Sequence, residues 1–356
     1  MNALAQRLAR AIRREGPLPV SVFMTFALHD PQSGFYAARE AIGAGGAFVT
    51  APEISQVFGE LLGVWLLQVW RDQGRPANAM VVELGPGRAT LLADALRTLR
   101  SDGEFLDTAE IVLVEASPAL ESLQRERLRD GSTRLRWVRQ WSDVPRERPL
   151  FLIANEFLDA LPIRQFVKTE RGWCERTVTV DALDRLAFAL APLPLPLSIP
   201  LGRGVAEPGA VYEISPGAEA LVEDIARVIT NRGGAGLFID YGYAGKGFGD
   251  TLQAVAHHES VDVLASPGEA DLSAHVDFGA ITESARAGGA RVLGPIAQGD
   301  LLEALGIEVR AARLEEANPE QAIRVGVRRL VDPEMMGSLF KALAIVPQAA
   351  PAPPGF

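Results

Sequence analysis

Residues 80–96 have the sequence MVVELGPGRATLLADAL, and this stretch decides the fold. A β-branched apolar run that ends in Glu83 predicts a buried strand, and leucines at helical spacing from Leu91 predict a helix. Two glycines that flank a proline stand between them and predict a tight turn, where glycine adopts positive φ and leaves room for a ligand. This order is typical of a nucleotide-binding α/β domain, although plain strand-to-helix turns use the same residues.

Two classes of ligand use such a turn, the dinucleotides and S-adenosylmethionine. The dinucleotide pattern G-x-G-x-x-G requires a third glycine at position 90, where this chain has Thr90. Glu83 lies two residues before the first glycine, where a carboxylate offsets the charge of a cationic methionine moiety but repels a pyrophosphate. The turn of Gly85, Pro86 and Gly87, together with Glu83, therefore favours S-adenosylmethionine.

The composition describes a long and acidic chain. Its 356 residues, of which 48% are hydrophobic, allow one to three domains. We find no long uncharged apolar run and no secretory leader, so we expect a soluble protein of the cytoplasm with no membrane span. The single cysteine cannot form an internal disulfide, and the four histidines lack ligand spacing, so we expect no metal site. A net charge of −10 without a basic stripe argues against nucleic acid as a partner.

Beyond the glycine turn, strands and helices alternate as in a parallel sheet with crossover helices. The strand at 111–114 is followed by Glu115, whose carboxylate can accept hydrogen bonds from both hydroxyls of a ribose. The alternative is a charge at the N-terminus of the next helix. We assign Ala116 to the same site, and Trp141 and Ser142, beyond the third strand at 135–138, to the adenine by position alone.

The fourth strand, residues 150–154, is followed by Asn155, Glu156 and, three residues later, Asp159. Ligands of open parallel sheets lie beyond the carboxyl ends of the strands. We therefore expect this amide and these two carboxylates to face the reacting centre. The alternative is that they cap a following helix.

The remaining segments lead to a division into domains. Residues 1–75 are predicted to form an N-terminal helical cap with a glycine-rich lid at 43–55, which could also be a plain surface connection. Residues 76–163 and 205–346 form the predicted cofactor-binding sheet domain, and residues 164–204 an inserted β meander and linker. The Pro- and Ala-rich tail, 347–356, is expected to be disordered.

Four motifs in this order resemble the MidA family of S-adenosylmethionine-dependent methyltransferases, which is related to the mitochondrial complex I assembly factor that dimethylates an arginine symmetrically. The motifs are ELGPG at 83–87, TAPEIS at 50–55 with FGE at 58–60, NEFLDALP at 155–162 and ADLSAHVDF at 270–278. Two positions depart from the family. Ala89 stands where a third glycine is more frequent, which we expect to cost little, and Ala47 replaces the acid of a usual Gly-Asp-Phe.

The resemblance implies an α/β fold with a Rossmann-like, seven-stranded methyltransferase sheet whose last strand is antiparallel. It implies S-adenosylmethionine as cofactor and a protein arginine as substrate, with a subunit of respiratory complex I as the candidate. We assign Thr50 and Pro52, which lie in a family motif, to the cofactor site. The oligomeric state stays open, with a homodimer among the alternatives.

Methyl transfer to arginine needs a nitrogen with a free lone pair, which a guanidinium with a pKa above ~12 lacks. Glu156 and Asp159 are our candidates for a carboxylate pair that binds the guanidinium and removes its proton. Asn155 would orient the methionine end or the target nitrogen. Two other classes stay open, an assembly chaperone that keeps the fold without turnover and a nicotinamide dehydrogenase, against which Thr90 argues.

Overall fold

The computed structural model describes residues 1–37, 50–129, 134–196, 205–245, 247–317 and 322–356. Most of the glycine-rich segment predicted as a lid, including Ala47, lies outside these described residues, as does part of the predicted linker. The chain forms two compact units: unit 1 is Met1–Phe48, Asp159–Ala218 and Gly245–Asp277, and unit 2 is Val49–Leu158, Glu219–Ala244 and Phe278–Phe356. This division cuts the chain at other positions than the division predicted above.

Unit 2 is built on a sheet with the strand order β15-β16-β10-β5-β2-β3-β4. The neighbours from β4 to β10 are parallel, whereas β16, the last strand of the chain, is antiparallel to both β10 and β15. The predicted Rossmann-like α/β class and the antiparallel last strand are thereby confirmed. The strands are β2 (Met80–Leu84), β3 (Glu110–Val114), β4 (Arg134–Val138), β5 (Leu150–Asn155), β10 (Gly234–Tyr243), β15 (Arg291–Ala297) and β16 (Phe340–Val346).

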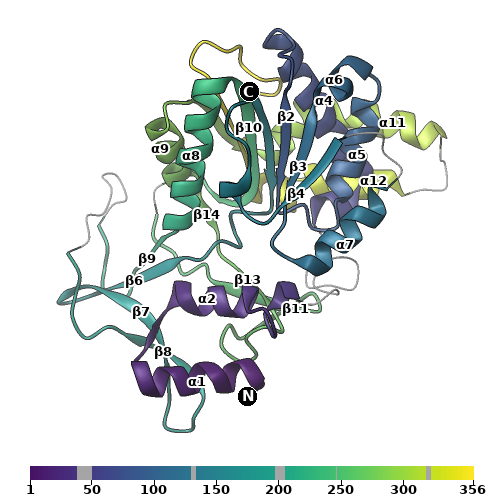
Figure 1. Cartoon of the computed structure of the whole chain (residues 1–356). Coiled ribbons are helices and arrows are strands. Elements are labelled where there is room, and N and C mark those ends of the chain that lie inside the picture. Colours follow the sequence, from purple (N-terminus) through teal and green to yellow (C-terminus); the bar gives the residue numbers. More distant parts are fainter. Residues whose placement is uncertain (38–49, 130–133, 197–204, 246, 318–321) are drawn as a thin grey trace. The chain divides into compact units, whose positions relative to one another are not determined.

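Helices cover both faces of this sheet (Figure 1). α8 (Pro216–Arg232) and α9 (Phe278–Ala287) lie along one face, and α4 (Gln56–Asp72) and α5 (Thr90–Leu99) along the other. Side chains alternate along the strands as the pleat requires, so that Val81, Ile111 and Phe151 pack into the same apolar cluster as α4 and α5. The other helices of unit 2 are α3 (Ala51–Ile54), α6 (Gly103–Thr108), α7 (Pro118–Arg127), η2 (Trp141–Asp143), α10 (Gln298–Ala304), α11 (Ile307–Ala317), α12 (Ile323–Val331) and α13 (Met336–Leu339).

The backbones of α4 and α5 approach closely at two glycines that lie about one turn apart in α4. A Cβ on Gly59 would lie 2.8 Å from the carbonyl oxygen of Leu91, and a Cβ on Gly63 would lie 2.7 Å from that of Ala95. A carbon atom does not fit at either distance. The missing side chains therefore set the spacing of the two helices.

We expect Gly63→Ala to lower the free energy of unfolding by about 1–3 kcal/mol, because the added methyl forces the two helices apart. Urea denaturation followed by circular dichroism measures this change. Gly103→Ala in α6 is the matched control, since a Cβ there meets nothing within 4 Å. Equal stability of the two variants would contradict the close packing.

Unit 1 contains two small antiparallel sheets and two N-terminal helices. One sheet has the order β1-β7-β6-β9 with β8 beside β7, and the other has the order β12-β11-β13. Phe23 and Met24 of α2 are fully buried in a core that includes Val178 of β7. No described helix of the chain is both long and apolar enough to cross a membrane. The elements are α1 (Ala3–Glu15), β1 (Leu18–Pro19), α2 (Val20–His29), η1 (Phe35–Ala37), β6 (Arg164–Thr169), β7 (Gly172–Val180), β8 (Leu186–Leu190), β9 (Val211–Ile214), β11 (Gln253–Ala256), β12 (Glu259–Val261), β13 (Asp271–Ser273) and β14 (Val276–Asp277).

The prediction of a disordered C-terminal tail is wrong. Ala350 and Phe356 pack against the apolar cluster of unit 2, and Pro353 is buried. A Cβ on Gly355 would lie 2.5 Å from Leu301 Cδ1, so the tail lies directly on α10. The tail carries no charged residue, and its proline, alanine and phenylalanine side chains bury apolar surface once they have a helix to cover.

Candidate functional site

The glycine turn connects β2 to α5 at the carboxyl edge of the sheet. Gly85 and Gly87 have φ values of 60° and 54°, in the left-handed region that glycine adopts without strain. The backbone N–H of Gly85 donates to the carbonyl of Val114 at 3.1 Å, which holds the turn against the end of β3. A Cβ on Gly85 would lie 2.7 Å from the ring of Phe157. Both the backbone angle and the available space therefore require glycine at position 85.

Ala89 also adopts a left-handed conformation, with φ of 57° and ψ of 29°. For a residue with a Cβ this conformation costs roughly 1–2 kcal/mol. The expectation that alanine costs little at this position is therefore wrong for the backbone. Its methyl group is fully buried in the core of unit 2, which offsets part of the cost.

Glu83 places a buried carboxylate under the glycine turn. The residue is 4% exposed, and among the described residues no donor lies within hydrogen-bonding distance of its Oε2. Burial, and then the nearby charge of Glu115, raise the pKa of Glu83 from 4.5 to about 8. An ionised buried carboxylate without a donor is costly, so this atom fits a cationic or hydrogen-bond-donating ligand.

We expect the cofactor-free protein to lose stability as the pH rises from about 4.5 to about 8, because the folded state keeps a proton on Glu83 that the unfolded chain releases. Glu83→Gln removes this proton equilibrium. The stability of the variant relative to the natural protein should rise by up to about 1.4 kcal/mol per pH unit within that window. Melting temperatures of both proteins between pH 4.5 and 9 measure the difference, and parallel curves would contradict a raised pKa.

The carboxylate of Glu115, next to the glycine turn at the end of β3, is held at both oxygens. Its Oε1 accepts from the backbone N–H of Ser117 at 2.7 Å, and its Oε2 accepts from Gln124 Nε2 at 2.9 Å. Burial raises the pKa of Glu115, and these two donors counteract the rise. Ser117 Oγ accepts from the N–H of Leu120 and so provides the side-chain cap of α7. Glu115 therefore binds a backbone N–H at the start of α7, as the alternative interpretation predicted, and is also connected through Gln124 to the carbonyl of Gly87.

Asn155 is the last residue of β5, and it shares a hydrogen bond with Glu156. Asn155 Nδ2 donates to Glu156 Oε1 at 3.2 Å, and the same oxygen accepts from the backbone N–H of Ala51 at 2.8 Å. Glu156 has a φ of 49°, a strained conformation of the kind that clusters at functional sites. Between Glu156 and β6 the described chain contains no helix, so a cap of a following helix is excluded. Glu156 instead binds the first N–H of α3, a helix far back in the chain.

The segment with Thr50 and Pro52 forms the start of α3. The side chain of Thr50 makes no capping hydrogen bond, and Pro52, which has no N–H, is buried. Ala51 is therefore the helix-start amide that needs an acceptor, and Glu156 supplies it. At the other end of α3, Glu53 accepts a hydrogen bond from Thr90, the first residue of α5. Through these two hydrogen bonds, α3 connects Glu156, directly after β5, with Thr90, the first residue of α5.

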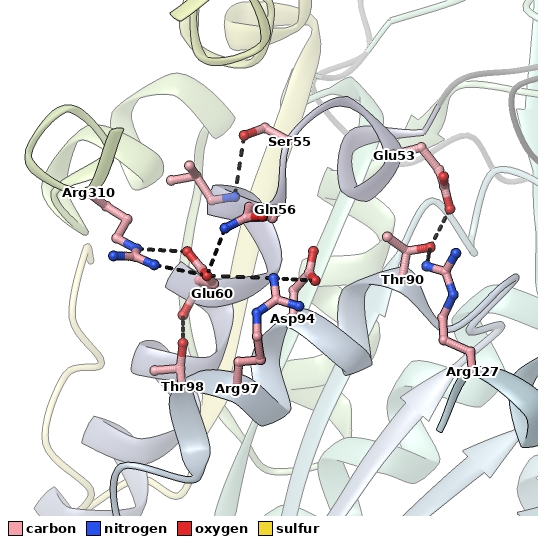
Figure 2. A network of polar contacts seen from close by, with 11 residues as sticks. Glu53, Ser55, Gln56, Glu60, Thr90, Asp94, Arg97, Thr98, Arg127 and Arg310 are labelled. Carbon is pink, nitrogen blue, oxygen red and sulfur yellow. Dashed lines mark hydrogen bonds and ion pairs between the residues drawn. The ribbon is translucent and has the colours of Figure 1, made fainter. Parts of the chain in front are cut away.

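Figure 2 shows the polar contacts that hold this region together. Thr90 also accepts from Arg127, at the end of α7. Further along α4, the buried carboxylate of Glu60 accepts from Arg310 of α11 at 2.7 and 3.0 Å. Arg97 lies 3.6 Å from the same carboxylate and 2.6 Å from Asp94. These ion pairs connect the three helices α4, α5 and α11.

Asp240 is a residue of the candidate site that the sequence analysis did not identify. It is 1% exposed in β10, and its Oδ2 accepts from the backbone N–H groups of Phe157 at 3.1 Å and Leu158 at 2.9 Å. These bonds fix the loop that carries Glu156. The sequence does contain a pattern that marks Asp240, because it is the single acidic residue in the apolar strand at 236–242.

The remaining assigned residues lie around this edge or outside unit 2. Ala116 is exposed between Glu115 and the start of α7, and Ser142 is exposed beyond β4. The indole N–H of Trp141 donates to Asp224 of α8 at 2.7 Å. Asp159 belongs to unit 1, where its carbonyl accepts from the N–H of Ala274 in the ADLSAHVDF motif at 3.0 Å. Its placement beside Glu156 therefore stays a prediction.

Comparison with known proteins identifies the relatives of this chain. A family of S-adenosyl-L-methionine-dependent methyltransferases matches residues 61–296. Protein arginine methyltransferase NDUFAF7, mitochondrial, from Xenopus tropicalis is 37% identical over 91% of this chain and 80% of its own length, and the protein from Homo sapiens is 36% identical over 91% and 78%. A crystal structure from Burkholderia thailandensis with bound S-adenosyl-homocysteine is 30% identical, covers 99% of this chain and 94% of that chain, and has a TM-score of 0.87.

These names correct one expectation. The curated relatives are named as mitochondrial proteins, which contradicts the cytoplasmic location expected from the sequence. That expectation rested on the distribution of apolar residues in the sequence, which does not distinguish one compartment from another. The family match also removes the dehydrogenase alternative. By its family match, its relatives and its fold, the chain belongs to the MidA family of S-adenosylmethionine-dependent methyltransferases.

Proposed function

We propose that this methyltransferase modifies arginine side chains of a protein substrate at the carboxyl edge of the sheet in unit 2. The names of the relatives, which are protein arginine methyltransferases, support the substrate class. One geometric observation supports the place. Leu84 of β2 and Ala154 of β5 are paired neighbours, so the glycine turn and the Asn155–Glu156 pair begin side by side.

The residues at this edge fit S-adenosylmethionine. Gly85 and Gly87 form a left-handed turn at the end of β2, and Glu83 offers a buried acceptor. The Oδ1 of Asn155 is likewise buried with no donor among the described residues. We assign Glu83 and Asn155 to the methionine end, and Glu115 with Ala116 to the ribose. The assignments of Pro86 to the turn, of Trp141 and Ser142 to the adenine, and of Thr50 and Pro52 to the cofactor rest on position and family resemblance.

When bound, S-adenosylmethionine supplies an electrophilic methyl group on a sulfonium. Glu156 and Asp159 would bind the guanidinium and accept its proton as the nitrogen–carbon bond forms. Hydrogen bonds from Ala51 and Asn155 hold Glu156 Oε1 in one orientation. The carboxylate is therefore fixed before substrate arrives, which favours alignment of the attacking nitrogen.

We propose a subunit of respiratory complex I as the protein substrate, on the family resemblance alone. A homodimer is one alternative for the oligomeric state, which sedimentation of the purified chain measures. Neither alters the chemistry assigned to Glu156.

Methyl transfer from labelled S-adenosylmethionine to a cognate lysate, followed by mass spectrometry, tests the proposed function. We expect label on guanidino nitrogens of arginine with the natural chain and about 100-fold less with Glu156→Gln. Binding of S-adenosylhomocysteine without any transfer would instead support a chaperone that keeps the fold. Label on another residue type would contradict the assigned substrate class.

A further inference from the structure

We propose that Gln124 is a positioning residue for the cofactor. Its side chain holds the Glu115 carboxylate against the glycine turn, so that both carboxylate oxygens face a ribose. This inference rests on the proposed placement of the ribose at Glu115. Gln124 and Leu120, one helical turn apart, are the fully buried residues of α7. The helical period predicts an apolar side chain at position 124. A buried glutamine at this position departs from the apolar pattern of the helix. Such departures are expected at functional sites.

Each polar atom of the Gln124 side chain has a partner. Nε2 donates to the carbonyl of Gly87 at 2.8 Å and to Glu115 Oε2 at 2.9 Å, and Oε1 accepts from Trp137 Nε1 at 2.9 Å. These partners come from the glycine turn, the end of β3 and the neighbouring strand β4. A single side chain thus fixes the position of the carboxylate relative to the turn.

Trp137 determines which way the amide of Gln124 points. An indole N–H can only donate, so it must face the amide oxygen and leave the NH₂ group to Gly87 and Glu115. The flipped amide would place its oxygen against two acceptors. Arg125 lies over the indole with its Cζ 4.0 Å from the ring centroid and covers the ring. The orientation of Gln124 is therefore set from outside the site.

The hydrogen bonds to Glu115 leave room for a ligand. Ser117 occupies one lone pair on Oε1 and Gln124 occupies one on Oε2. Each carboxylate oxygen has two lone pairs, so one acceptor position remains on each oxygen. Two ribose hydroxyls require two such positions on one carboxylate. Because the rotamer is already fixed, binding does not have to order the side chain.

Calorimetric titration of the full chain with S-adenosylhomocysteine tests this inference. We expect Gln124→Met to weaken binding about fivefold, as the net loss of one hydrogen bond implies. An analogue whose ribose lacks both hydroxyls should bind the variant and the natural protein equally. Trp137→Phe keeps an aromatic ring and removes the orienting donor, so it should show the same selective loss. In a Glu115→Ala background, Gln124→Met should cause no further loss.

Gln298→Met is the matched control, because Gln298 is also fully buried in unit 2 and donates to the carbonyl of Leu330 at 2.9 Å. We expect it to leave both affinities unchanged.

The inference would be overturned if Gln124→Met weakened the binding of S-adenosylhomocysteine and of the analogue without ribose hydroxyls equally. It would also be overturned if Gln124→Met left the binding of S-adenosylhomocysteine unchanged while Glu115→Ala weakened it. Unchanged binding in Glu115→Ala would overturn the ribose site and this inference with it. If Gln124→Met does not fold, Trp137→Phe takes its place, and equal weakening of the two ligands by that variant would overturn the inference.

Discussion

Glu156→Gln is expected to lower methyl transfer about 100-fold while leaving the fold and cofactor affinity nearly unchanged. The reason lies in what the substitution keeps and removes. The amide oxygen of glutamine can still accept from the N–H of Ala51, so the start of α3 keeps its acceptor. The negative charge that binds a guanidinium and takes its proton is lost. Turnover, melting temperature and cofactor affinity are measured on one preparation.

Glu156→Ala separates the two roles of this side chain. It removes the charge and also the acceptor for Ala51, so we expect the same loss of turnover with an additional loss of about 1 kcal/mol in stability. Asp159→Asn should lower turnover as Glu156→Gln does if the two acids act as a pair. A fully active Glu156→Gln beside a destabilised Glu156→Ala would show that Glu156 only holds α3.

Local sequence patterns were sufficient for part of the sheet of unit 2, although β15 was not predicted. The apolar runs predicted at 80–84, 111–114 and 150–154 match β2, β3 and β5 within a residue, because buried parallel strands are continuous apolar runs. The strand predicted at 135–138 matches β4, which is partly exposed and carries two arginines. The antiparallel direction of β16 came from the family resemblance, since no local pattern encodes strand direction. The order of the tail could not be predicted, because its burial depends on Leu301, which is distant in the chain.

For the candidate site, the sequence predicted which residues lie at strand ends but not which distant residues bind one another. Glu83, Glu115, Asn155 and Glu156 lie at the ends of the strands that were predicted to carry them. The acceptor of the Ala51 amide is 105 residues away, and the Asp240 carboxylate is 83 residues from the Phe157 amide that it binds. The periodic patterns that predict helices and strands give no information on contacts between residues so far apart in the chain. Only the three-dimensional structure joins them.

Glu115→Ala is expected to weaken the binding of S-adenosylhomocysteine by about 10- to 150-fold, the range for a lost hydrogen bond to a charged group. The carboxylate is buried beside the glycine turn and held at both oxygens, so the natural protein presents it to a ribose without rearrangement. Alanine leaves the ribose hydroxyls with water or no partner at the same edge. Calorimetric titration at fixed pH and salt measures the change.

The control for Glu115→Ala is Glu121→Ala, which removes an acid from the first turn of α7 with the same change in net charge. Glu121 is bound by Arg125 at 2.8 Å and Arg139 at 2.9 Å rather than by the turn, so its loss should leave cofactor affinity unchanged. If both variants weaken binding equally, the cause is the net charge near the turn and not a contact with the ribose. If only Glu115→Ala weakens binding, and the analogue without ribose hydroxyls is unaffected, the carboxylate acts on those hydroxyls directly.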